Sequence, residues 1–159
     1  MSNQADIREE IHFELEQLRQ VADLASELSS VLPEQRRPWD VAAAAKIVAD
    51  FSVGFENMCR RRYRYLGKPL PEGPDSHSVM LNDFVAVHGP GSSLAPELKE
   101  RLRKYLRFRH RFVHSYGLRM RWEIVDEPLR LLPDTVSQLS KVWEAWLESL
   151  SPEQGGGQL

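Results

Sequence analysis

The chain has 159 residues, a length typical of one domain, and 42% of them are hydrophobic, which is enough to form a core. This composition excludes a disordered, collagen-like or fibrous protein, and no apolar run approaches the roughly 20 residues of a membrane span. The formal net charge is only −2. The N-terminus lacks the basic and then apolar pattern of a secretory signal, and the single cysteine, Cys59, cannot form an internal disulfide. We therefore expect a cytoplasmic protein in which Cys59 packs as a small apolar side chain.

Two long helices are expected in the first part of the chain. Apolar residues recur at steps of three and four from Ile7 to Val31, which predicts an amphipathic helix ending before Pro33. The recurring residues are Ile7, Ile11, Leu15, Leu18, Val21, Leu24, Leu28 and Val31. The second helix has Asp40 as its expected N-cap and continues through an arginine run to about Leu66. Small alanines in its first half predict close packing against the first helix.

A loop and a short helix follow. Residues 67–76 are rich in glycine and proline, which predicts an exposed loop. A third helix is expected from about 79 to 87, with Ser76 or Ser78 as its cap. A glycine-rich turn then separates it from a fourth helix that starts near Ala95.

The fourth helix carries aromatic residues at steps of three and four, and Gly117 is expected to close it. These aromatic residues are Tyr105, Phe108, Phe112 and Tyr116. A final helix is expected over roughly Trp122 to Leu150, bent or divided at Pro133. We expect a single helical-bundle domain over residues 1–152 and a flexible tail over residues 153–159.

No segment alternates with period two over a useful length, so the fold class is all-α. Long helices joined by short turns imply an antiparallel bundle of about five helices. The tryptophans lie at helix starts or on apolar faces, where core packing explains them better than base stacking. They are Trp39, Trp122, Trp143 and Trp146.

The positive charges are concentrated in two segments. Residues 97–121 carry +7 and residues 60–68 carry +5, so the rest of the chain sums to −14. An acidic protein with its arginines concentrated in this way can attract a polyanion at a defined site. Alternatively, the arginines are solvated or pair with acids on neighbouring helices. The charge pattern alone does not decide between these interpretations.

Most catalytic patterns are absent: there is no glycine-rich phosphate loop, no Gly-x-Ser-x-Gly, no His-Glu-x-x-His and no cysteine pair. The remaining candidate is the segment from Arg109 to Tyr116 at the end of the basic helix. At about 100° per residue, Arg109 and Tyr116 differ by only about 20°, so Arg109, His114 and Tyr116 can line one broad cleft.

Histidine and arginine together suit the cleavage of RNA. Histidine exchanges protons near neutral pH, and the planar guanidinium of arginine matches a phosphate. Since the nucleophile can be the RNA's own 2′-OH, no metal is required. A symmetric dimer would bring two copies of His114 and Arg109 into one cleft.

Other interpretations of the same residues stay open. His114 can be a helix-end histidine favoured by the helix dipole, with Arg109 a surface residue. His110 and His114, four residues apart, could bind zinc, but no third ligand is evident. Tyr116 can be a core or interface aromatic residue.

The motif Arg109-x4-His114-Ser115-Tyr116 resembles that of the HEPN superfamily, and within it the HepT-like toxins of toxin–antitoxin modules. The resemblance covers most of the chain, since these proteins are helical bundles in which the motif ends a late helix and another long helix follows. It implies a homodimeric, metal-independent endoribonuclease without a cofactor, with Arg109 and His114 as catalytic residues. By analogy with the family, the substrate is RNA, with transfer RNA as a target. The resemblance also implies a minimal nucleotidyltransferase antitoxin that attaches adenylate to Tyr116, which would add negative charge to the cleft.

The chain departs from the family pattern at one position, where His110 replaces the usual asparagine after the motif arginine. This leaves open whether His110 aids catalysis, only orients a phosphate or marks a divergent member of the family. The second basic run has no counterpart in the family, and on charge grounds alone we expect it to extend the RNA-binding surface. The expected RNA-binding residues are Arg60, Arg61, Arg64, Arg107 and Arg111. The alternative function is a non-catalytic helical module that binds a nucleotidyltransferase partner or nucleic acid.

Overall fold

The computed structural model describes residues 3–113 and 120–150, which form five α-helices, one short 3-10 helix and no strand. The elements are α1 (Gln4–Ser29), η1 (Pro33–Gln35), α2 (Pro38–Tyr65), α3 (Ser76–Val85), α4 (Pro96–Val113) and α5 (Trp122–Ser149). This architecture confirms the predicted all-α bundle of about five helices.

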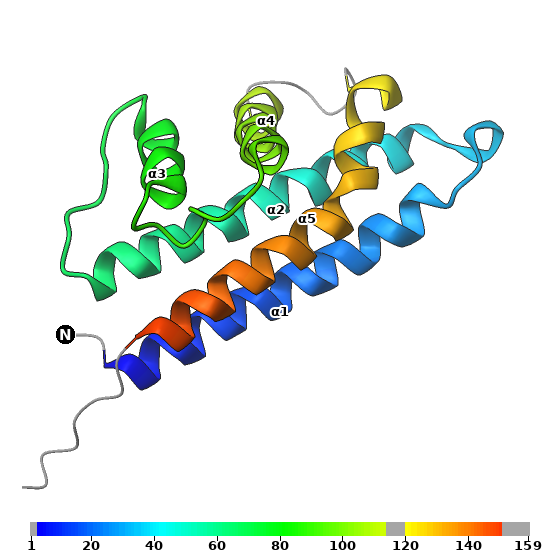
Figure 1. Ribbon diagram of the computed structural model, residues 1–159. Helices are drawn as coiled ribbons and strands as arrows, with labels where there is room; N and C mark the ends of the chain where they lie inside the picture. Colours follow the sequence, from blue (N-terminus) through cyan, green and yellow to red (C-terminus); the bar gives the residue numbers. More distant parts are fainter. Residues whose placement is uncertain (1–2, 114–119, 151–159) are drawn as a thin grey trace, which may run out of the picture.

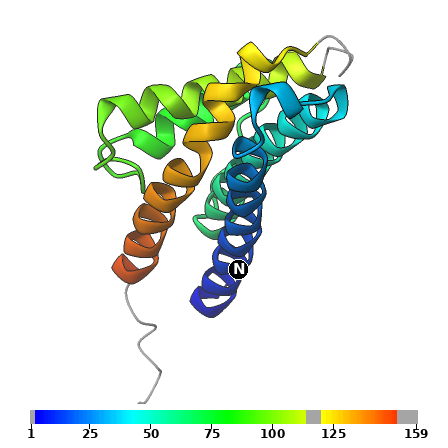
Figure 2. The ribbon, with the colours of Figure 1, turned by 90° about the vertical axis from the view of Figure 1, so that its right-hand side faces the viewer.

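The three long helices, α1, α2 and α5, pack along one another, while α3 and α4 lie on α2 (Figure 1). α1 runs antiparallel to both α2 and α5, as expected for a bundle with short turns. α4 instead crosses the long helices at a steep angle (Figure 2). At this crossing the Ser52 hydroxyl donates to the carbonyl oxygen of Tyr105 at 2.9 Å, and the rings of Phe51 and Tyr105 lie 4.6 Å apart. The second half of α4 is therefore fixed against α2.

The buried face of α1 differs from the predicted one in its second half. After Leu18, the buried residues are Ala22 and Ala25, whereas Leu24 is 52% exposed. The prediction for Leu24 was wrong because it lies about 120° around the helix from Leu18. Small residues also bring α1 and α2 together, since a Cβ added to Gly54 would lie 2.6 Å from Leu18 Cδ2.

Two helices start earlier than predicted. Arg37 is the N-cap of α2, and Asp40 is the third helical residue, whose Oδ2 accepts the Arg37 backbone N–H at 2.9 Å. Asp40 is not the N-cap because Pro38, with its fixed φ, takes the first helical position. α3 begins at Ser76 with Asp75 in the N-cap position, so neither predicted serine caps it.

α5 is one continuous helix with Pro128 and Pro133 inside it. Its first turns lie at an angle to the rest (Figure 1), which agrees with a proline-induced bend. The bend brings α5 to α4, where the Tyr105 hydroxyl donates to the Pro128 carbonyl oxygen at 2.6 Å.

The tryptophans do not all serve the core. Trp143 is fully buried, whereas Trp39 is 62% exposed at the start of α2. Trp39 follows the α1–α2 turn, where no other helix covers its ring, and the Arg37 guanidinium lies 5.2 Å from it. The core-packing interpretation is therefore wrong for Trp39.

Two predicted boundaries, the helix end at Gly117 and the domain end at residue 152, lie outside the described residues. Among the described helices, none combines the length and the apolar character needed to cross a membrane.

Candidate active site

The motif arginine, Arg109, lies near the end of α4 and points at α2. Its Nη1 lies 2.5 Å from each carboxylate oxygen of Glu56. The Glu56 side chain is only 4% exposed, and that of Arg109 is 29% exposed. A buried carboxylate needs a charged or hydrogen-bonding partner, so this ion pair both satisfies Glu56 and fixes the guanidinium in place.

Two more basic side chains approach the same carboxylate. His77, on α3, places its Nδ1 3.0 Å from Glu56 Oε1, although the two groups are not aligned as a hydrogen bond. Arg60, one turn further along α2, places Nη2 3.9 Å from Glu56 Oε2. Glu56 is thus the charged centre at which α2, α3 and α4 meet.

Sequence analysis missed both Glu56 and His77. A signal existed for Glu56, because it lies at steps of three and four with Ser52, Cys59 and Tyr63 in the buried face of α2. An acid in such a face predicts a basic partner on a neighbouring helix. No comparable signal existed for His77, since its position depends on the path of the loop before α3.

The other two motif residues, His114 and Tyr116, lie outside the described residues, so their roles stay predictions. Residues 3–113 and 120–150 contain no group of three or more histidine, cysteine or acidic side chains arranged to hold a metal ion.

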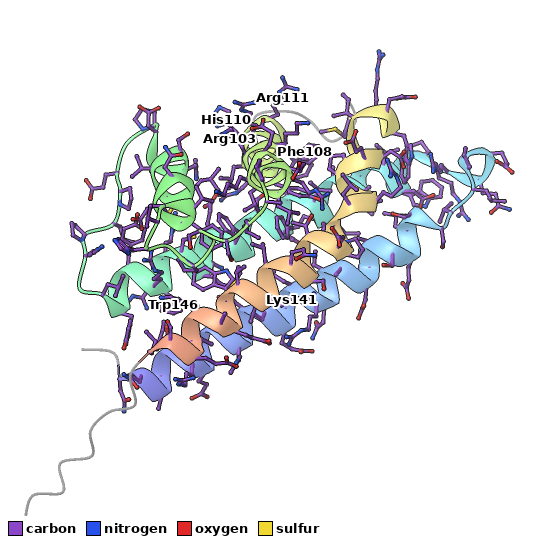
Figure 3. The ribbon with its side chains drawn as sticks, viewed as in Figure 1. Arg103, Phe108, His110, Arg111, Lys141 and Trp146 are labelled. Atoms are coloured by element: carbon purple, nitrogen blue, oxygen red, sulfur yellow. The ribbon has the colours of Figure 1, made fainter. Side chains whose placement is uncertain are left out.

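A groove runs between α3 and α4 beside this cluster. His77, Ser78 and Leu81 line it from α3. Its basic lining comes from one side of α4 and consists of Arg103, Arg107, His110 and Arg111. In Figure 3, Arg103 and His110 lie on the side of α4 that faces α3. The predicted residues His110, Arg107 and Arg111 therefore share one surface.

The arginine run of α2 is arranged differently. Arg61 faces α1, where Glu14 and Glu10 lie 2.9 and 3.2 Å from its guanidinium. This charge is compensated within the fold, and the role of Arg61 in RNA binding stays a prediction. Arg64 is exposed, and no carboxylate of the described chain lies within ion-pair distance of it.

The buried tyrosines and the cysteine near the α2–α4 contact are neutral. Burial raises the pKa of Tyr105 to about 12, and burial likewise raises the pKa of Tyr63 to about 12. Burial also raises the pKa of the Cys59 thiol, so Cys59 stays protonated at neutral pH and is buried in the core. The charges at this site therefore come from Glu56 and the basic residues around it.

Comparison with known proteins identifies the family of this chain. A family model described as HepT-like protein matches residues 43–150, well over half of the chain. The chain therefore belongs to the HepT-like proteins, a family of the HEPN superfamily whose members are in general nuclease-type modules. The match confirms the resemblance and covers Glu56, His77, Arg109 and the groove. No curated protein and no solved structure matches the chain.

Proposed function

We propose that this protein is the toxin of a toxin–antitoxin module, a cytoplasmic homodimer that cleaves RNA without a metal ion. The observation that carries this proposal is Arg109, the motif arginine of a HepT-like chain, held at the end of α4 by the buried carboxylate of Glu56. A surface arginine without a role needs no such anchor, whereas a phosphate-binding arginine benefits from a fixed guanidinium.

In the proposed reaction, the 2′-oxygen of the RNA attacks the adjacent phosphorus, and the bond from phosphorus to the 5′-oxygen breaks. His114 of one protomer accepts the proton of the 2′-OH, and the second protomer's His114 protonates the leaving 5′-oxygen. The products are a 2′,3′-cyclic phosphate and a 5′-hydroxyl.

Arg109 supports this step by stabilising charge on the phosphate oxygens. Glu56 engages Nη1, and the guanidinium has further N–H donors on Nη2 and Nε to offer a phosphate. His110 contributes as an accessory residue, and Arg60, Arg64, Arg107 and Arg111 supply charge for RNA binding. Transfer RNA is the proposed substrate class by family analogy.

The proposal includes the family's mode of inhibition. A minimal nucleotidyltransferase antitoxin attaches adenylate to Tyr116, which lies within the basic segment of residues 97–121. The added phosphate brings negative charge to a cleft that accepts an anionic backbone, so RNA binding is weakened.

Cleavage of labelled total RNA and transfer RNA in excess EDTA tests the proposal. The wild-type protein should leave cyclic or 3′-phosphate ends, and His114→Ala should leave the RNA intact. Arg109→Lys keeps a positive charge beside Glu56 but loses the planar guanidinium, so we expect a folded protein with cleavage reduced about 100-fold or more.

Equal cleavage by the wild type and His114→Ala would overturn the mechanism. Absence of cleavage by a folded, dimeric wild type whose intact mass shows no adenylate would overturn the enzymatic function and support a non-catalytic binding module. In cells, induction of the toxin alone should arrest growth, and induction of the His114→Ala protein should not.

A further inference from the structure

The groove between α3 and α4 presents positive charge that the fold does not compensate. Arg103, Arg107 and Arg111 follow one another at four-residue intervals, about 6 Å of helix rise for each step. Arg103 pairs with Glu100 at 2.6 Å. Arg107 and Arg111 are exposed, and no carboxylate of the described chain lies within ion-pair distance of either. Among the described residues, no acidic side chain lines the groove.

The groove adjoins the buried cluster around Arg109. His77 lines the groove, and its Nδ1 also lies 3.0 Å from Glu56 Oε1. Glu56 in turn holds Arg109. The groove and the ion pair of the motif arginine therefore adjoin at His77.

The lining is not purely charged. Leu81 and Leu106, both largely buried, also line the groove. An RNA strand has the same combination, because it carries a phosphate at each nucleotide and apolar ribose and base faces between them.

We propose that the groove between α3 and α4 binds the phosphodiester backbone of a single-stranded RNA segment that flanks the scissile phosphate. This proposal rests on the ribonuclease function proposed above. Arg107 and Arg111 contact phosphates, and His77 marks the end of the groove nearest Arg109. An acidic protein segment could also pair with these arginines, but the position of the groove beside the motif arginine favours the nucleic acid.

Binding of a fluorescent 2′-O-methyl RNA oligonucleotide, followed by anisotropy over a range of salt concentrations, tests this assignment. The oligonucleotide lacks the nucleophilic 2′-OH and stays intact, so binding is measured apart from cleavage. Arg107→Gln with Arg111→Gln should weaken binding about 10-fold or more and lower the salt-dependence slope by about 1.4, which is about 0.7 for each lost phosphate contact.

The matched control is Arg130→Gln with Lys141→Gln, which removes two exposed positive charges from α5 without touching the groove. This control should bind within about twofold of the wild type, because charge far from the contact is largely screened by salt. With a cleavable RNA, the groove variant should show a raised KM and an unchanged kcat, because it changes binding of the flanking segment only.

Three results would overturn the groove assignment: wild-type affinity of the groove variant, an equal loss of affinity in the α5 control, or equally tight, groove-dependent binding of a polyglutamate peptide. If the wild type cleaves RNA while the groove variant binds normally, the groove assignment fails and the function stands. If RNA binding depends on the groove but the wild type never cleaves, the ribonuclease function fails and the groove is the RNA-binding site of a non-catalytic module.

Discussion

On α2, three consecutive arginines face three different neighbours, whereas on α4 the arginines at every fourth position share one side of the helix. Successive residues of a helix point about 100° apart, so Arg60, Arg61 and Arg62 reach Glu56, Glu14 and Asp83 respectively. On α4, Arg107 and Arg111 point to the same groove and have no carboxylate within ion-pair distance in the described chain. The comparison teaches that the role of an arginine run depends on the acids that the fold brings to it.

Arg109 differs from Arg107 and Arg111 because its charge is compensated by a buried acid, and its removal is expected to have the largest effect on stability. Arg109→Met leaves the buried Glu56 carboxylate without its closest cation, so the free energy of unfolding should fall by about 3 kcal/mol. Urea unfolding measures this loss. Glu56→Gln in the Arg109→Met background should recover a large part of it, whereas additive losses would show that the pair is not coupled.

Within the arginine run of α2, the buried Arg62 contrasts with the exposed Arg64. The Arg62 side chain is 8% exposed, and it lies 2.9 Å from Asp83 and 5.9 Å from the ring of Trp146. Arg62→Met should cost about 2 kcal/mol, since Asp83 is partly exposed and regains water when the guanidinium is lost. Arg64→Met, two residues away and exposed, should change the free energy of unfolding by less than about 0.5 kcal/mol. Equal effects of the two substitutions would contradict the assigned partners.

A substitution of Tyr105 tests the hydrogen bond that joins α4 to α5. Tyr105→Phe removes the hydrogen bond to the Pro128 carbonyl oxygen and should cost about 1.5 kcal/mol at neutral pH. Burial raises the pKa of Tyr105 from 10.0 to about 12, so the unfolded chain loses this proton first as the pH rises. The free energy of unfolding should therefore fall between about pH 10 and pH 12, and Tyr105→Phe should make this fall shallower. Parallel pH profiles for the wild type and Tyr105→Phe would disprove the assignment.

Arg61 and Arg107 give the smallest effect and the most direct comparison of the two runs. Arg61→Gln breaks the contacts with Glu14 and Glu10 and should lower the free energy of unfolding by about 1 kcal/mol. Arg107→Gln should leave stability within about 0.5 kcal/mol of the wild type while weakening RNA binding. Thermal unfolding and RNA binding of both variants provide the measurement, and the reverse pattern would contradict the distinction between α2 and α4.

The helices were predictable because each has apolar residues at steps of three and four, and this period follows from helix geometry alone. The first residues of the helices were harder to predict. Asp40 and the serines near α3 are good capping residues, yet Arg37 and Asp75 occupy the N-cap positions. The start of α2 was set by the preference of Pro38 for the first helical position. The steep crossing of α4 over α2 depends on contacts between distant segments, such as that of Ser52 with Tyr105.

The sequence by itself determined the fold class, the motif at the end of the basic helix and membership of the HepT-like family. Only the tertiary structure decided that Glu56 and His77 adjoin Arg109, and that Arg61 is compensated while Arg107 is not. The physical reason is the distance in sequence between the residues that interact. Helical periodicity is set by residues three and four positions apart in the sequence. By contrast, the ion pairs of Arg61 with Glu14 and of Arg109 with Glu56 join residues that are 47 and 53 positions apart. Charges interact through space, and their distances are fixed only when the helices have packed.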